Sequence, residues 1–181
     1  IEPTPAALAA DSEVVITIVS NAAAVDALYI GPEGLLSPEV RGKLFIEMST
    51  LRPGVEQALA AKVRAKGAAL VDCPVGGTVG PASEGELLGF VGGEEADVAR
   101  ARPVLDQLCR RVDHVGPIGS GASMKLAINL PLLVYWQVLG EALSLCQPLG
   151  LDAAKVIDIF MQTSGANTAL KARGALIAVS L

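Results

Sequence analysis

The chain has 181 residues, with 14 Lys and Arg against 19 Asp and Glu, and a net charge of −5. This acidic balance and the lack of any basic run exclude the usual nucleic-acid surface, where clustered Lys and Arg displace counterions from phosphates. Hydrophobic residues make up 51% and aromatic residues 3%, so we expect an interior packed closely from Ala, Val, Leu and Ile.

Strands alternate with helices along the first two thirds of the chain. Alternation with helices of about 10–15 residues indicates βαβ units, and the predicted fold is therefore α/β with a doubly wound parallel sheet. Apolar and β-branched runs predict strands at 14–19, 43–48, 69–73, 87–91 and 111–115, and helical spacing predicts helices at 22–29, 55–66 and 94–109.

The pattern changes after Gly121. One long helix is predicted over 122–148 and a second over 152–162. The long helix is apolar on nearly all sides, which favours burial between domains or subunits and so a homo-oligomer. Polar residues and a proline interrupt its apolar core, which falls short of a bilayer span of about 20 residues, so no membrane is expected. We therefore expect a sheet domain over 1–117 and a helical domain over 118–181.

The cysteines and the single histidine predict neither a disulfide framework nor a metal site. Cys73, Cys109 and Cys146 lie far apart with no C-x-x-C pair, and their number is odd. His114 has no cluster of thiols with which to form a zinc site, so a surface or satisfied core role is expected. A reducing cytoplasm is the expected location. The start at Ile1 lacks both an initiator Met and the pattern of a signal peptide, so we expect the sequence to begin midway along a protein.

A glycine-rich segment, D-C-P-V-G-G-T-V-G-P-A over 72–82, follows the third predicted strand. Ligands of open α/β sheets bind outside the carboxyl ends of the strands. Gly76, Gly77 and Gly80 leave room for backbone N–H groups to approach a bound anion. The alternative is a tight loop that needs glycine only for its backbone angles.

Lys125 and Asn129 lie four residues apart at the start of the long predicted helix, so they share one helix face. The positive end of the helix dipole and the loss of hydration both favour a neutral lysine. A neutral amine of this kind can transfer protons as a general acid or base. The alternative is a lysine that covers the apolar helix with its stem and keeps its ammonium in water.

These motifs in this order resemble the 3-hydroxyisobutyrate dehydrogenase family of β-hydroxyacid dehydrogenases. The likeness spans nearly the whole chain. The family's loop D-x-P-V-S-G-G-x-x-G-A is matched at Asp72, Pro74, Val75, Gly77 and, one place early, Gly80. Its lysine motif is matched at Gly119, Gly121, Lys125 and, one place further on, Asn129, and its S-T-x-x-P at 49–53.

The resemblance implies a Rossmann-like sheet without its first βαβ unit, followed by the start of an all-α domain like that of 6-phosphogluconate dehydrogenase. It implies hydride transfer between NAD or NADP and a small 3-hydroxy acid or its semialdehyde. Lys125 is then the general acid and base, and Asn129 orients the substrate. NAD is not separated from NADP, because the G-x-G-x-x-G turn and the residue that reads the ribose lie in the first unit.

The resemblance also assigns binding residues. Thr50 corresponds to the family's cofactor-contacting threonine, and Val19, Ser20 and Asn21 correspond to a segment that passes beside the dinucleotide.

The loop at Gly76, Gly77 and Thr78 is implied to hold the substrate carboxylate. Two departures stand there, since Gly76 replaces a serine and Thr78 replaces a glycine. Glyoxylate, succinic semialdehyde and tartronate semialdehyde remain alternative substrates. The other hypothesis is a catalytically inactive fragment or dimerising module of the same fold.

Overall fold

The computed structural model describes residues 1–180 and divides into two compact units, residues 1–127 and the residues from Ile128 onward. The division falls inside the long helix α6 (Ser120–Leu145), later than the predicted boundary after residue 117, because α6 continues unbroken from one unit into the other. The assignment of 1–117 to a partial dinucleotide-binding domain and of 118–181 to a partial helical domain stays a prediction.

The first unit contains a six-stranded sheet that is mostly parallel, as expected for the α/β class. β1 pairs with β2 and β2 with β3 in parallel, and β6 pairs in parallel with β5. The strands are β1 (Val14–Thr17), β2 (Leu44–Glu47), β3 (Ala69–Asp72), β4 (Val75–Gly76), β5 (Leu87–Gly92) and β6 (Cys109–Gly116).

Strands β5 and β6 are found where the sequence predicts them, but their direction differs from a purely parallel sheet. β5 runs antiparallel to β3 and to β4. The segment between β3 and β5 contains only the two-residue β4 and the five-residue α4 (Val79–Ser83). A parallel return needs a crossover of a dozen or more residues, usually a full helix. The helix and strand in this segment are therefore too short for a parallel crossover, and β5 returns antiparallel to β3.

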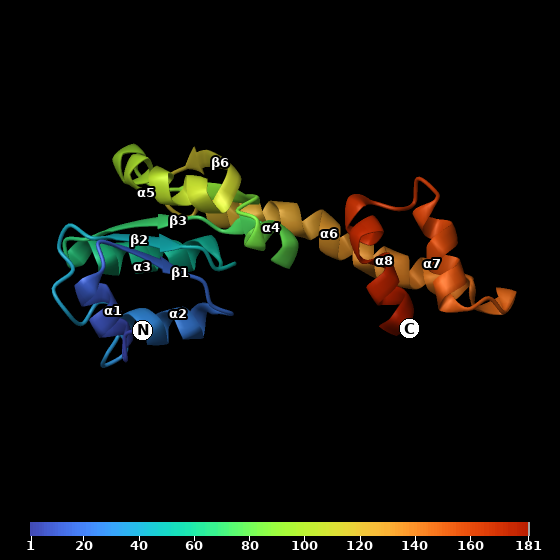
Figure 1. The fold of residues 1–181 in the computed structure, drawn as a ribbon, viewed down its shortest axis with the longest axis horizontal. Helices are drawn as coiled ribbons and strands as arrows, with labels where there is room; N and C mark the ends of the chain where they lie inside the picture. The colour runs from blue at the N-terminus through green and yellow to red at the C-terminus, as the bar shows by residue number, and fades with distance from the viewer. Residues whose placement is uncertain (181) are drawn as a thin grey trace. The chain divides into compact units, whose positions relative to one another are not determined.

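Helices cover both faces of the sheet, which is the doubly wound arrangement (Figure 1). Neighbouring residues of a strand point to opposite faces. Phe45 and Leu70 accordingly pack with α1 (Pro5–Asp11), α2 (Ala22–Ile30) and α3 (Pro53–Ala65). Ile46 and Val71 pack on the other face with α5 (Glu95–Leu108). Both central strands are thus buried on two sides, as their uninterrupted apolar sequence predicts.

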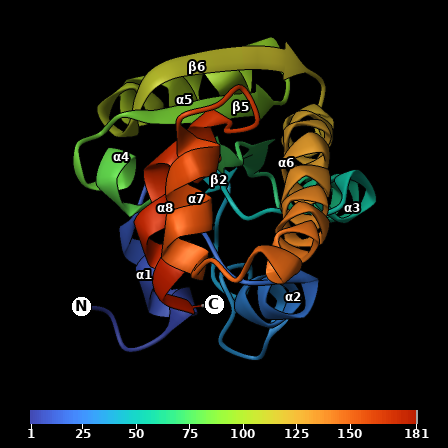
Figure 2. The same ribbon diagram turned by 90° about the vertical axis from the view of Figure 1, so that its right-hand side faces the viewer.

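The second unit is helical. After α6 come the 3₁₀ turn η1 (Gln147–Leu149), α7 (Ala153–Met161) and α8 (Thr168–Ser180). Leu139, Ile157 and Leu170 form its core. Helices α7 and α8 lie side by side (Figure 2), and a methyl group added at Gly174 would be 2.5 Å from the Met161 sulfur. The sequence predicts α7 but not α8, because the apolar residues of α8 do not gather on one helical face.

Helix α6 is exposed over most of its length. Leu130 and Leu133 are each 64% exposed, and Ala122 and Leu139 are its buried apolar residues. The expected burial of this helix between domains or subunits stays a prediction, because most of its apolar residues are exposed within this chain and no second subunit is present. Together with η1 it is long and apolar enough to cross a membrane by length and composition alone. The expectation of no membrane also stays a prediction.

Candidate functional site

A buried hydrogen-bond network joins the carboxyl ends of β1 and β2. The Thr17 hydroxyl donates to the Glu47 carboxylate, so the Tyr29 hydroxyl donates to Thr17 at 2.8 Å. The other Glu47 oxygen accepts the Ser49 backbone N–H at 2.7 Å. The Ser49 hydroxyl oxygen accepts the Val19 backbone N–H at 2.8 Å. Burial raises the pKa of Tyr29, which stays a neutral donor. The network fixes the backbone at the edge where both strands end.

The predicted cofactor residues come together at this edge. Val19 is half-buried, and its backbone N–H donates to the Ser49 hydroxyl oxygen. Ser20, Asn21 and Thr50 are exposed. The Asn21 side-chain oxygen accepts the backbone N–H of Ala24 at 2.9 Å and so caps α2. Asn21 therefore has a structural task of its own. The role of the four residues towards a dinucleotide remains a prediction.

The predicted substrate loop begins with β4 and continues into α4. Gly77 has a φ of 131°, and a methyl group added there would lie 2.7 Å from Leu87 Cδ2, so this position requires glycine. At Gly76 an added methyl group meets nothing closer than Phe90 Cε2 at 3.5 Å. Gly76 is therefore not demanded by space, and its departure from serine changes the chemistry of the loop. Thr78 is exposed beside it.

Asp72 joins the end of β3 to the start of α6. Its side chain is fully buried. One carboxylate oxygen accepts the Gly119 N–H at 2.7 Å, and the other accepts the Ala122 N–H at 2.7 Å. Burial raises the pKa of Asp72, and these backbone N–H groups oppose that shift. The sequence predicts Asp72 only as a position in the loop motif, because its partners are 47 and 50 residues away.

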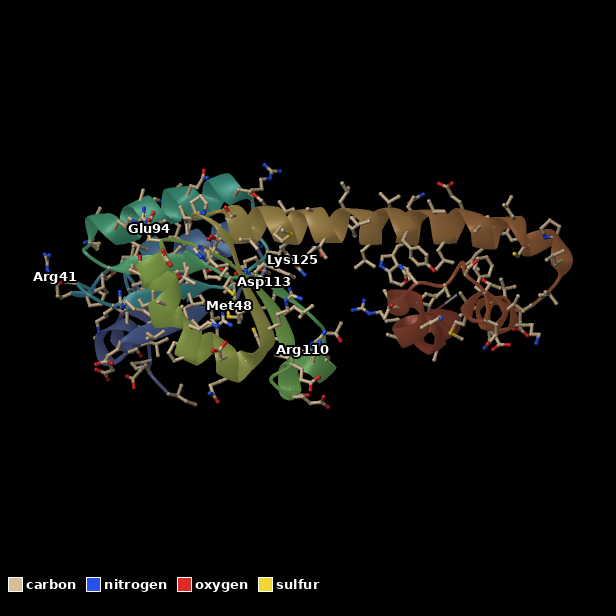
Figure 3. The ribbon with its side chains drawn as sticks, turned by 90° about the horizontal axis from the view of Figure 1, so that it is seen from above. Arg41, Met48, Glu94, Arg110, Asp113 and Lys125 are labelled. Atoms are coloured by element: carbon tan, nitrogen blue, oxygen red, sulfur yellow. The ribbon has the colours of Figure 1, made fainter. Side chains whose placement is uncertain are left out.

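Lys125 lies in the second turn of α6 and is half-buried. Figure 3 shows its side chain extending from the helix toward the rest of the first unit. Burial lowers the pKa of Lys125, in the direction that the sequence predicts. No hydrogen bond or ion pair holds its ammonium within residues 1–180. Asn129 follows one helical turn later, in the second unit, and is also half-buried.

Glu56 is a buried acid that the sequence does not reveal. A glutamate in the first turn of α3 would normally face solvent and interact with the helix dipole. Here the side chain is fully buried, and neither carboxyl oxygen has a hydrogen-bond partner among the described residues. Burial, with smaller contributions from Glu47 and Asp72, raises the pKa of Glu56 to about 9. Glu56 is therefore a neutral acid at pH 7.

The raised pKa makes the stability of the first unit depend on pH. The folded state holds the Glu56 proton more tightly than the unfolded chain, in which the pKa is near 4.5. The contribution of Glu56 to the free energy of unfolding is fully present below pH 4.5. It is lost as the pH rises toward about 9, by up to about 1.4 kcal/mol per pH unit. We expect Glu56→Met to remove this part of the pH dependence in urea unfolding at pH 6 and pH 8.

The exposed Glu95 in the first turn of α5 provides the matched control. Glu95→Met is expected to keep the slope of the unmodified protein. If the free energy of unfolding changed equally with pH in the Glu56 variant and in the unmodified protein, Glu56 would not be a neutral acid in the folded state.

No group of three His, Cys, Asp or Glu side chains suited to a metal ion occurs in the described part of the chain. The His114 Nε2 atom lies 3.0 Å from the carbonyl oxygens of both Gly93 and Gly116, so the ring has local partners. The three cysteines are free.

Comparison with known proteins gives a consistent result. Residues 1–116 match the family described as the NAD binding domain of 6-phosphogluconate dehydrogenase. The 3-hydroxyisobutyrate dehydrogenase of Pseudomonas aeruginosa is 39% identical over 159 residues, which are 88% of this chain and 53% of that protein. The chain thus spans about half the length of the curated relatives it matches.

Two solved structures are also similar. The Mycobacterium tuberculosis 3-hydroxyisobutyrate dehydrogenase with L-serine superposes with a TM-score of 0.72 at 31% identity, over 90% of this chain and 55% of that one. Psf3 in complex with NADP+ and 2-OPP superposes with a TM-score of 0.82 at 28% identity, over 94% of this chain and 61% of that one.

Proposed function

Because the chain belongs to the family of the NAD binding domain of 6-phosphogluconate dehydrogenase, we propose that it is part of an NAD- or NADP-dependent 3-hydroxyacid dehydrogenase. The reaction interconverts a small 3-hydroxy acid and its semialdehyde. Residues 1–117 form the partial dinucleotide-binding domain and residues 118–181 the partial helical domain. A cytoplasmic location belongs to the same proposal, since three free cysteines suit a reducing compartment.

The observation that carries this proposal is the half-buried Lys125 on α6. Its lowered pKa raises the share of neutral amine, which can accept the hydroxyl proton as the alcohol is oxidised. In the reverse direction the ammonium returns that proton to the carbonyl oxygen. NAD or NADP, when bound, supplies the nicotinamide that accepts or donates the hydride. Asn129, one turn further along the helix, orients the substrate in this proposal.

The carboxyl ends of β1 and β2 fit a dinucleotide. Ser20 and Thr50 present hydroxyl groups to solvent at the edge where two parallel strands end, which is where open α/β sheets bind nucleotides. The Val19 backbone is fixed there by Ser49. We propose that Val19, Ser20, Asn21 and Thr50 contact the cofactor.

The loop of Gly76, Gly77 and Thr78 is proposed to hold the substrate carboxylate. Gly76 and Gly77 have no side chain of their own, and Gly77 and Thr78 are exposed. Backbone N–H groups and a hydroxyl are suitable donors to a carboxylate.

The test is turnover by the intact protein with NAD and NADP. Oxidation of 3-hydroxyisobutyrate and L-serine with the oxidised cofactors, and reduction of glyoxylate, succinic semialdehyde and tartronate semialdehyde with NADH or NADPH, are followed at 340 nm. We expect at least one of these substrates to be turned over with one of the two cofactors. The absence of turnover with all ten pairs of substrate and cofactor would overturn the dehydrogenase proposal.

The open space at Gly76 leads to a prediction about substrate binding. Gly76→Ser adds a hydroxyl where an added methyl group fits, and a hydrogen bond to a charged group contributes enough to lower the KM for the hydroxy acid about tenfold. Gly77→Ser is the contrasting control, because its backbone and Leu87 both disfavour a side chain. An unchanged KM in the folded Gly76 variant would place the carboxylate elsewhere.

The second candidate function is a catalytically inactive fragment or dimerising module. The observation in its favour is the exposed apolar surface of α6, where Leu130 and Leu133 are each 64% exposed and Val138 is 56% exposed. Large exposed apolar patches mark interaction sites. This candidate predicts self-association without turnover, and a monomer in sedimentation at all concentrations would contradict it. The dehydrogenase proposal also includes a homo-oligomer.

A further inference from the structure

We infer that Asp72 is a positioning residue for Lys125, because its carboxylate fixes the first turn of α6 against the end of β3. The inference rests on the proposed role of Lys125 as acid and base. It assigns Asp72 neither a contact with substrate nor a proton-transfer step, since both of its oxygens bind backbone N–H groups inside the first unit.

Helix α6 has no side chain of its own to cap its start. The residue before the helix is Gly119, and the first turn contains no acidic residue. The first N–H groups of a helix have no partner within the helix and need one from elsewhere. Asp72 provides it from another element, with two short bonds of 2.7 Å that its negative charge and the helix dipole strengthen.

Glycines make room for this carboxylate on two sides. A methyl group added at Gly92 would lie 2.4 Å from the Asp72 oxygen that accepts the Gly119 N–H. One added at Gly121 would lie 2.9 Å from the oxygen that accepts the Ala122 N–H. Gly92 is also the residue that pairs with Asp72 across β3 and β5. The end of β3, the end of β5 and the start of α6 therefore meet around one buried acid.

The bond to Ala122 determines where Lys125 points. The two residues are three apart in the helix, so they lie on the same face in successive turns. Asp72 also starts the loop that is proposed to hold the substrate carboxylate. The Asp72 carboxylate thus fixes the position of α6 along its axis and its rotation about that axis, and so positions the Lys125 amine. Asp72 also fixes the start of the proposed substrate loop.

The test is a double-mutant cycle in the intact protein with the cofactor and substrate found to turn over. Asp72→Asn keeps the size of the side chain but presents an amide N–H to one of the two backbone donors. We expect kcat to fall about 10- to 100-fold with little change in the KM for the cofactor, because a displacement near 1 Å has that effect on a reacting group. In the Lys125→Ala background, Asp72→Asn should cost no further activity per folded protein.

Each outcome is informative. Equal loss from Asp72→Asn in both backgrounds would overturn the positioning role, since a purely structural effect multiplies with any other. Full activity of Lys125→Ala would instead overturn the proposed function. If Asp72→Asn does not fold, hydrogen exchange in the unmodified protein decides: strong protection of the Gly119 and Ala122 amides supports the role, and exchange as fast as in an open loop overturns it.

Discussion

Lys125→Ala is expected to lower kcat of the intact enzyme by about 10²- to 10⁴-fold, the range for removal of a general acid or base. The KM for the cofactor should change little, because the amine is proposed to act on the substrate oxygen. In the unmodified enzyme, kcat for oxidation should rise with pH through an inflection below 10.5, since burial lowers the pKa of Lys125. The inflection should be absent from the variant. Steady-state kinetics across pH measure both effects.

Two further lysine variants show whether the loss of kcat comes from the missing proton transfer or from the missing positive charge. Lys125→Arg keeps the positive charge but cannot give up its proton, so it should be as inactive as the alanine variant. Lys155→Ala removes an exposed lysine of α7 and should retain activity. A Lys125→Arg enzyme with near-normal kcat would show that charge is sufficient and would remove the acid and base role.

The sheet was the most predictable part of the structure. β2 and β3 are buried on both faces, and such strands are uninterrupted apolar runs that the sequence displays directly. The direction of β5 was not predictable from its own residues. It depends on the chain between β3 and β5, where β4 and α4 are too short to give a regular signal. Helix α8 was missed because its packing depends on contacts such as that of Gly174 with Met161.

The candidate site divides in the same way. Lys125 and the glycine loop could be proposed from the sequence because each belongs to a local motif, and their roles stay predictions. Asp72 could not be assigned its partners, since its bonds cross 47 and 50 residues of sequence. Glu56 could not be predicted as a buried acid either, because a glutamate at a helix start is ordinarily solvated. In both cases the physical role arises from burial, which only the folded chain defines.

Gly121→Ala is expected to destabilise the first unit by about 3 kcal/mol, at the upper end for overpacking. The added methyl group would lie 2.2 Å from the Phe90 carbonyl oxygen and 2.9 Å from that of Asp72. These are backbone atoms of the sheet, so no flexible side chain can move away, and the start of α6 must separate from β3 and β5. The free energy of unfolding in urea measures the effect.

Gly140 in the same helix provides the opposite result. An added methyl group there meets nothing within 4 Å. Gly140→Ala should therefore stabilise the protein by about 0.5–1 kcal/mol, since alanine is the better helix former and restricts the unfolded chain. Because the two changes are chemically identical, the difference in sign isolates the close approach of α6 to the sheet. Equal effects of the two substitutions would show that the helix start does not lie against the backbone of β5, and the positioning of Lys125 by Asp72 would lose its structural basis.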